Sequence, residues 1–248
     1  MLKCDFHLHS REDPRDVLSY SAFDLIDHAA QLGYHVLSLT LHGKIYCPDE
    51  LRHYAASKKI LLIPGVEFYL DHREVLLLGV THQDLTHLRS LDDLRTLKQE
   101  LGDKIFIIAP HPYYHLRQCL GKKLEIYAEM FDAIEFCRLY TRWWNPNDQA
   151  GKVASQIGKP TIACSDAHCL QWMNDHYFLV DAQPNQEEIF TAIRKGRIKN
   201  ISRPLGSHEL FYQAFWCLVI LKFLTWKRRW WQPFFALFCC SRILEQLN

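Results

Sequence analysis

Histidines and carboxylates stand at both ends of the main part of this chain with the same short spacing. The first apolar segment ends in His7 and His9, and the last one ends in Asp166 and His168. Residues two positions apart project from the same face of an extended strand, as chelation of one ion requires. Imidazole and carboxylate groups without thiolates suit Zn²⁺, Mn²⁺ or Fe²⁺ at a hydrolytic site. These two pairs therefore predict a divalent-metal site.

Residues of the same chemistry also follow the apolar segments in between, namely His42, Glu67, His111 and Glu135. The carboxyl ends of parallel strands meet at one rim, which is where α/β barrels place their chemistry. Chance explains one or two such placements better than it explains six. The alternative, a set of buried histidines satisfied by carboxylates, leaves the shared rim unexplained. Glu135 is the weakest member, because a charged residue at a strand end is common.

Seven apolar segments supply these ends, and they span 2–9, 35–42, 60–70, 74–80, 104–112, 131–137 and 160–168. Their hydrophobicity is continuous rather than alternating, which indicates strands buried on both faces of a parallel sheet. Amphipathic segments predict helices over 21–33, 84–102, 147–158 and 185–196. The first of these has Ser21 as its N-cap and stops at Gly33. The alternation predicts an α/β fold, either a barrel or a doubly wound sheet.

Composition narrows the class of protein. The chain has 248 residues and a net charge of +1, which suits one large domain or a domain with an appendage and indicates neither a nucleic-acid nor an acidic partner. Its nine cysteines are odd in number and contain no CxxC pair. Charged residues interrupt the N-terminus before any signal-peptide core. We therefore expect a reduced, cytoplasmic protein.

Five short motifs, in order, make the chain resemble the PHP (polymerase and histidinol phosphatase) family. They are His7-Leu8-His9, Thr40-Leu41-His42, Gly65-Val66-Glu67, His111-Pro112 and Ser165-Asp166-Ala167-His168. Asp13 matches an acid that often follows the first motif, and Asp16 is a nearby alternative. The resemblance covers residues 1 to 203, and the motifs are specific only together.

The resemblance implies a distorted (β/α)₇ barrel with one to three divalent cations (Mn²⁺, Zn²⁺ or Fe²⁺). It assigns the first cation to His7, His9, Glu67 and Asp166. A second would share Glu67 and add His111, and a third would use Asp13, His42 and His168. The chain departs from the family at two positions. Leu41 replaces an aspartate expected to support His42, and Leu76 replaces a histidine, for which His72, Glu135 or Cys137 are alternative donors.

These features predict a hydrolase that cleaves phosphate esters with a metal-activated water. A protonated His42 or His168 would serve the leaving oxygen if it is not used as a ligand. Lys44, Arg117 and Arg138 follow strand ends and are candidates for binding phosphate, the alternative being solvated charges at the rim.

The substrate class follows less directly. Residues 1–200 lack a basic stripe, so we expect a small phosphorylated substrate, with a nucleotide as first choice. Trp143 and Trp144 either wall the substrate pocket or cover the end of the barrel. Two alternatives stay open, a nuclease acting on DNA or RNA ends and a non-catalytic phosphate-binding or membrane-scaffold module.

Residues 204–248 form a separate hydrophobic and basic extension of the domain at 1–203. The apolar stretch at 213–226 is shorter than the roughly 20 residues of a spanning helix, and Lys222 interrupts it. Basic residues beside tryptophans suit the surface of a membrane. A partner-binding segment and a helix pair packed on the barrel are the other two interpretations.

Overall fold

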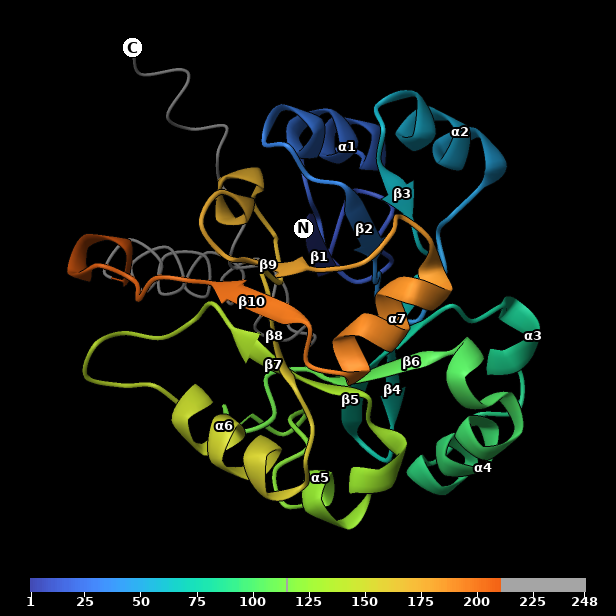
Figure 1. Cartoon of the computed structure of the whole chain (residues 1–248), viewed down its shortest axis with the longest axis vertical. Coiled ribbons are helices and arrows are strands. Elements are labelled where there is room, and N and C mark those ends of the chain that lie inside the picture. The colour runs from blue at the N-terminus through green and yellow to red at the C-terminus, as the bar shows by residue number, and fades with distance from the viewer. Residues whose placement is uncertain (115, 211–248) are drawn as a thin grey trace, which may run out of the picture.

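The computed structural model describes residues 1–114 and 116–210 (Figure 1). Nearly all of the predicted extension at 204–248, including its predicted membrane contact, lies outside the described residues. Among the residues that are described, no helix has the length and apolar character needed to cross a bilayer.

The described strands form two five-stranded sheets. The first has the order β10-β9-β1-β2-β3, and the second has the order β4-β5-β6-β7-β8. In the first sheet the strands are β1 (Leu2–Leu8), β2 (Val36–Leu39), β3 (Leu61–Leu62), β9 (Tyr177–Val180) and β10 (Ile198–Ile201). In the second they are β4 (Gly65–Leu70), β5 (Arg73–Leu78), β6 (Phe106–Ala109), β7 (Ala133–Cys137) and β8 (Thr161–Cys164).

The two sheets touch at two isolated parallel bridges. One joins Leu8 to Ala167, and the other joins His42 to Glu67. The α/β class is therefore confirmed, but the single (β/α)₇ barrel is not, because the described strands divide between two sheets. The bridges lie next to the predicted ligands, so the seam between the sheets is where the chemistry is concentrated.

Strand direction is parallel for β1–β2, β6–β7 and β7–β8, as the continuous hydrophobicity predicts. The prediction is wrong for β5, which runs antiparallel to both β4 and β6. A two-residue turn causes this, with Asp71 and His72 both at positive φ (48° and 63°). So short a connection permits only an antiparallel pair. As a result, β5 begins at the rim where the parallel strands end.

The helices surround the sheets, with α1 and α2 beside the first sheet and α3 to α6 beside the second (Figure 1). Their bounds are α1 Ala22–Gln31, α2 Asp49–Ser57, α3 His82–Leu85, α4 Leu91–Leu101, α5 Lys123–Ile126, α6 Asn147–Gln156 and α7 Gln186–Arg194. Short 3₁₀ helices cover Gly102–Lys104, Ala128–Met130 and Leu170–Met173. Ser21 caps α1 as predicted, in a reciprocal capping box with Asp24.

Two sequence predictions are corrected here. The single helix expected over 84–102 divides into α3 and α4, because Ser90 caps a new helix and exchanges hydrogen bonds with Asp93. β10 lies beyond the last of the seven segments that were expected to form strands, which ends at residue 168.

The core that supports the rim lies between the two sheets. Phe6 on β1, Leu76 on β5 and Phe106 on β6 belong to one buried cluster, together with Phe178 on β9. These side chains form an apolar floor beneath the polar residues. A second large cluster fills the space between the β4–β8 sheet and its helices.

Candidate metal centre

The structure brings all eight predicted metal ligands to one end of the sheets. They come from β1 and the loop after it, from β4, and from the segments that follow β2, β6 and β8. Seven of them belong to groups of potential ligand atoms that lie close together, and the eighth, His168, contacts Asp16 in one such group. The eight are His7, His9, Asp13, His42, Glu67, His111, Asp166 and His168.

One nitrogen of His7 and one of His9 lie close to carboxylate oxygens of Glu67 and Asp166. Nε2 of His7 lies 3.4 Å from Glu67 Oε2 and 3.4 Å from Asp166 Oδ1. Nε2 of His9 lies 3.5 Å and 3.4 Å from the same two oxygens. Two donors about 2.1 Å from a shared cation and at the tetrahedral angle would be roughly 3.4 Å apart. Each histidine nitrogen is therefore as far from each of the two carboxylate oxygens as two ligands of one cation would be.

The other ring nitrogen of each histidine is held by a carboxylate. His7 Nδ1 lies 2.9 Å from Glu135 Oε1, and His9 Nδ1 lies 3.0 Å from Asp13 Oδ2. A carboxylate only accepts hydrogen bonds, so each Nδ1 carries a proton, and in the neutral imidazole that ligation requires, Nε2 offers its lone pair. Both Nε2 atoms are buried and have no hydrogen-bond partner among the residues that the structure describes. Metal-binding histidines are oriented in this way.

A second group gathers around the other oxygen of Glu67. Oε1 lies 3.6 Å from His111 Nε2, and Glu74 Oε2 lies 3.8 Å from the same nitrogen. Glu74 is absent from the sequence prediction. It occupies the first half of β5, two residues before Leu76 and on the same face. The period of two could have identified it, but a search restricted to strand ends does not, because β5 enters the rim at its beginning.

The alternative donors for position 76 lie elsewhere. His72 is exposed in the β4–β5 turn. Glu135 accepts from His7 and from the backbone N–H of His111, the latter at 2.6 Å. Cys137 is buried and lines a neighbouring pocket.

The third group contains His42 and the two aspartates of the loop after β1. Asp13 accepts from the backbone N–H of His42 at 2.9 Å and lies 3.1 Å from its Nδ1. Asp16 Oδ2 lies 3.4 Å from the same Nδ1 and 2.9 Å from His168 Nε2. The support expected from an aspartate at position 41 thus comes from this loop instead, and Leu41 is part of the apolar core.

The backbone is strained at two of these residues. His111 has φ of 29° and Asp166 has φ of 47°, which are unusual for residues other than glycine. Each such conformation costs on the order of 1–3 kcal/mol and persists where the surroundings enforce it, often at functional sites. At His111 the hydrogen bond from its N–H to Glu135 is one such constraint.

Opposite charges set the pKa values in the cluster. Burial alone would raise the pKa of Glu67, but the imidazoles of His7 and His42 hold it well below its usual value. Burial would lower the pKa of His9, yet the neighbouring carboxylates of Asp13 and Asp166 raise it to about 10.

The donor set therefore fits a cation. Ligation requires neutral imidazoles, and the cluster would then hold a large excess of buried negative charge. Buried charge of one sign is costly unless it is compensated, which divalent cations would do here. The carboxylates concerned are Asp13, Asp16, Glu67, Glu74, Glu135 and Asp166.

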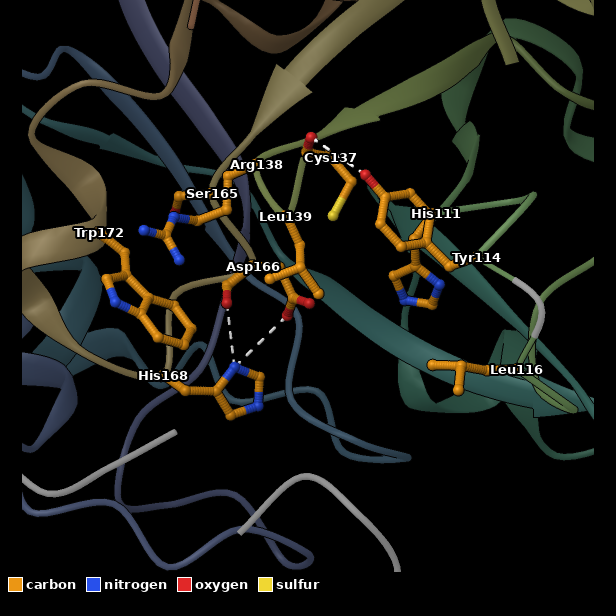
Figure 2. Close-up of a pocket in the computed structure, with 10 residues that line it drawn as sticks. All are labelled: His111, Tyr114, Leu116, Cys137, Arg138, Leu139, Ser165, Asp166, His168 and Trp172. Atoms are coloured by element: carbon orange, nitrogen blue, oxygen red, sulfur yellow. Dashed lines mark hydrogen bonds and ion pairs between the residues drawn. The ribbon is translucent and has the colours of Figure 1, made fainter. Parts of the chain in front are cut away.

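A pocket opens beside the cluster, and Figure 2 shows its lining. Asp166 and His168 form its polar side, and Tyr114, Leu139 and Trp172 form apolar walls. The guanidinium of Arg138, a predicted phosphate-binding residue, lies 4.2 Å from the centre of the Trp172 ring. Arg138 is only 7% exposed and has no ion pair with any other residue among 1–114 and 116–210.

The other two predicted phosphate-binding residues do not line this pocket. Lys44 donates from Nζ to the carbonyl oxygen of Glu12 at 3.0 Å, and Arg117 is exposed. Trp143 is 84% exposed, while Trp144 packs edge-on against Tyr114 with ring centres 5.6 Å apart. The tryptophan that walls the pocket is Trp172, which the sequence analysis passed over.

Part of the chain matches a known protein family. Residues 144–198 match the family model for PHP-associated regions. No curated protein sequence matches the chain significantly.

Three solved structures share the fold. A two-domain Bacteroides vulgatus protein containing a predicted PHP-like metal-dependent phosphoesterase is 20% identical, with 82% of this chain and 65% of that one covered and a TM-score of 0.62. A proposed metal-dependent phosphoesterase from Bifidobacterium adolescentis is 13% identical over 67% of this chain and 87% of its own, with a TM-score of 0.51. A lesion-specific endonuclease from Pyrococcus furiosus is 17% identical, with 80% and 57% covered and a TM-score of 0.56. The chain thus spans less than two thirds of the Bacteroides and Pyrococcus proteins.

Proposed function

We propose that this chain is a member of the PHP domain family and a metal-dependent hydrolase of phosphate esters. One observation carries the proposal. The buried Nε2 atoms of His7 and His9 converge with Glu67 and Asp166 beside a pocket that contains the guanidinium of Arg138, which forms no ion pair within the described part of the chain. Metal ligands and a phosphate-binding cation are the two requirements of this reaction, and here they are adjacent.

We assign the first cation to His7, His9, Glu67 and Asp166. Glu67 Oε1 and His111 contribute to a second position, and His42 with Asp13 and Asp16 offers a third. Divalent cations bound at such positions supply Lewis-acid activation of the phosphoryl oxygen and of an attacking water.

The remaining chemistry comes from the pocket residues. Arg138 would hold a non-bridging phosphate oxygen, because a planar guanidinium forms paired hydrogen bonds with phosphate. His168 faces two acceptors, the Asp166 carbonyl oxygen at 3.0 Å from Nδ1 and Asp16 Oδ2 at 2.9 Å from Nε2. We assign it the protonation of the leaving oxygen, and we assign His42, which is enclosed by carboxylates, to metal binding.

The pocket favours a small substrate with a flat or apolar leaving group. Tyr114, Leu139 and Trp172 offer surfaces for a nucleobase or an aromatic ring, next to Arg138. We therefore place nucleotides first among the substrates. The predicted membrane contact of residues 204–248 is not used in this proposal.

A nuclease is the second candidate. The exposed ring of Trp143 offers a stacking surface for bases, and Trp144 contacts Tyr114 in the pocket wall. The net charge of +1 favours short substrates over long nucleic acid.

The test is a panel of phosphomonoesters, phosphodiesters, nucleotides and short oligonucleotides, with Mn²⁺, Zn²⁺ or Fe²⁺ added. We expect phosphate release from a nucleotide monoester, and Asp166→Asn should abolish it. Cleavage of oligonucleotides alone would establish the nuclease instead. Absence of hydrolysis with every metal and ester would contradict the proposal.

A further inference from the structure

We propose that Glu74 is a metal ligand, which completes a second cation position together with Glu67 and His111. The inference rests on the proposed metal-dependent chemistry and adds a residue that the family motifs in this sequence do not supply.

Glu67 divides its two oxygens between two places. Oε2 lies within 3.4–3.5 Å of the free nitrogens of His7 and His9. Oε1 faces the other way, 3.6 Å from His111 Nε2. One carboxylate oxygen and one imidazole are too few to hold a cation, so this second position needs another donor.

Glu74 provides that donor from the neighbouring strand. Its Oε2 lies 3.8 Å from His111 Nε2, is buried, and has no hydrogen-bond partner within residues 1–114 and 116–210. The side chain as a whole is 3% exposed. An unpartnered carboxylate oxygen so deeply buried carries a large cost, which a bound cation would remove.

The strand register explains why position 74 can reach the site. In the antiparallel β4–β5 pair, Glu67 lies opposite Leu76, and Tyr69 lies opposite Glu74. Glu74 is therefore the diagonal neighbour of Glu67 on the same face, a distance that long side chains span. Leu76 is one layer lower, in the apolar floor with Phe106 and Ile108. Glu74 lies two residues closer than Leu76 to the start of β5, and therefore closer to the rim.

Arg15 suggests a competing structural role for Glu74. Its Nη1 lies 3.3 Å from Glu74 Oε1, and its side chain is nearly half exposed. This contact uses Oε1 and leaves Oε2 free. The Arg15 pair therefore does not compensate for the cost of burying Oε2 next to His111 and Glu67.

Metal stoichiometry tests the inference. Full-length protein, saturated with Mn²⁺ and freed of excess metal, is compared with Glu74→Gln by elemental analysis and by electron paramagnetic resonance. We expect the variant to hold one Mn²⁺ fewer per chain and to lose the spin coupling that a bridging Glu67 creates. Full stoichiometry and intact coupling in Glu74→Gln would overturn the inference, as would a single Mn²⁺ in the wild-type protein.

Two further variants separate ligation from the ion pair. Arg15→Gln removes the pair and keeps the carboxylate, and we expect it to retain the wild-type metal count. Glu74→His cannot pair with Arg15 but restores a donor, and we expect it to recover the second Mn²⁺. Loss of metal in Arg15→Gln, with no recovery in Glu74→His, would assign Glu74 to the ion pair. These readouts need no turnover, so they stay distinct from failure of the proposed activity.

Discussion

The parallel strands and the β4–β5 hairpin both contribute donors to the rim, but they do so in opposite ways. β1 and β8 deliver His7, His9 and Asp166 at or just after their carboxyl ends. The hairpin delivers Glu67 from the middle of β4 and Glu74 from the start of β5. A rule based on carboxyl ends therefore finds ligands on parallel strands and misses those on a strand that runs the other way.

The two regions also differ in how firmly they hold their donors. On the parallel side each imidazole is fixed by a buried carboxylate, Glu135 for His7 and Asp13 for His9. On the hairpin side Glu74 accepts a hydrogen bond from Arg15, which is partly exposed. We expect the first position to be preorganised and tight, and the hairpin position to bind metal more weakly and exchange it faster.

The largest effect should follow from removing the preorganised pair. His7→Ala/His9→Ala should lower hydrolysis by on the order of a thousandfold or more, because metal activation supplies several kcal/mol of transition-state stabilisation. Steady-state rates with Mn²⁺ measure this, with circular dichroism as a check on folding. A folded double variant with wild-type rates would move the chemistry away from the parallel strands.

A smaller loss should follow when the ligands stay in place and only their orientation is weakened. Glu135→Gln replaces the charged acceptor at His7 Nδ1 and at the backbone N–H of His111. Outer partners of this kind are typically worth 10- to 100-fold in metal affinity. Competition with a fluorescent chelator measures the change, and Arg15→Gln is the matched change on the hairpin side. Equal losses in the two variants would erase the proposed difference between the regions.

Arg138 probes the pocket that both regions border. Arg138→Met keeps much of the apolar contact with Trp172 and removes the charge. Hydrogen bonds to charged groups contribute about 1.5–3 kcal/mol, so KM for a phosphomonoester should rise roughly 10- to 100-fold. The metal content should stay at the wild-type value. An unchanged KM would place the phosphate elsewhere, and a lower metal content would point to a structural role instead.

The sequence could predict the ligands on the parallel strands better than those on the β4–β5 hairpin. Regular spacing along continuous apolar strands identified the ligand-rich rim, because parallel strands bring their ends together. The direction of β5 could not be read, since the Asp71-His72 turn lacks the glycine that usually marks a two-residue hairpin. Without that direction, Glu74 looks like an ordinary charge at the start of a strand.

The sequence also did not reveal β10 or the role of Trp172. The segment that forms β10 is short and has two polar residues, Lys199 and Asn200, at its centre, so its composition resembles a connection. Arg138 was found because it follows β7, whereas the ring that supports it, Trp172, lies in a short 3₁₀ helix far along the chain. Only the tertiary fold brings the two together.

His176 is a buried histidine outside the rim, and its pKa is shifted in the opposite direction to that of His9. His176 donates from Nε2 to the carbonyl oxygen of Phe136 at 2.7 Å, and its Nδ1 lies 2.7 Å from the hydroxyl of Ser202. Burial, together with the nearby charge of Arg138, lowers its pKa to about 3 despite the bond to Phe136. At the rim, in contrast, carboxylates raise the pKa of His9 to about 10.

The sign of the pH effect follows from this lowered pKa. Between pH 6.5 and 3 the unfolded chain binds a proton at His176 that the folded chain refuses, so the free energy of unfolding falls as the pH falls. The slope from this one group is at most about 1.4 kcal/mol per pH unit. Urea titrations of the wild type and His176→Gln between pH 7 and pH 5 should show the difference in stability shrinking or reversing toward pH 5. A constant difference would mean that His176 binds a proton equally well in the folded and the unfolded protein, which would contradict the lowered pKa.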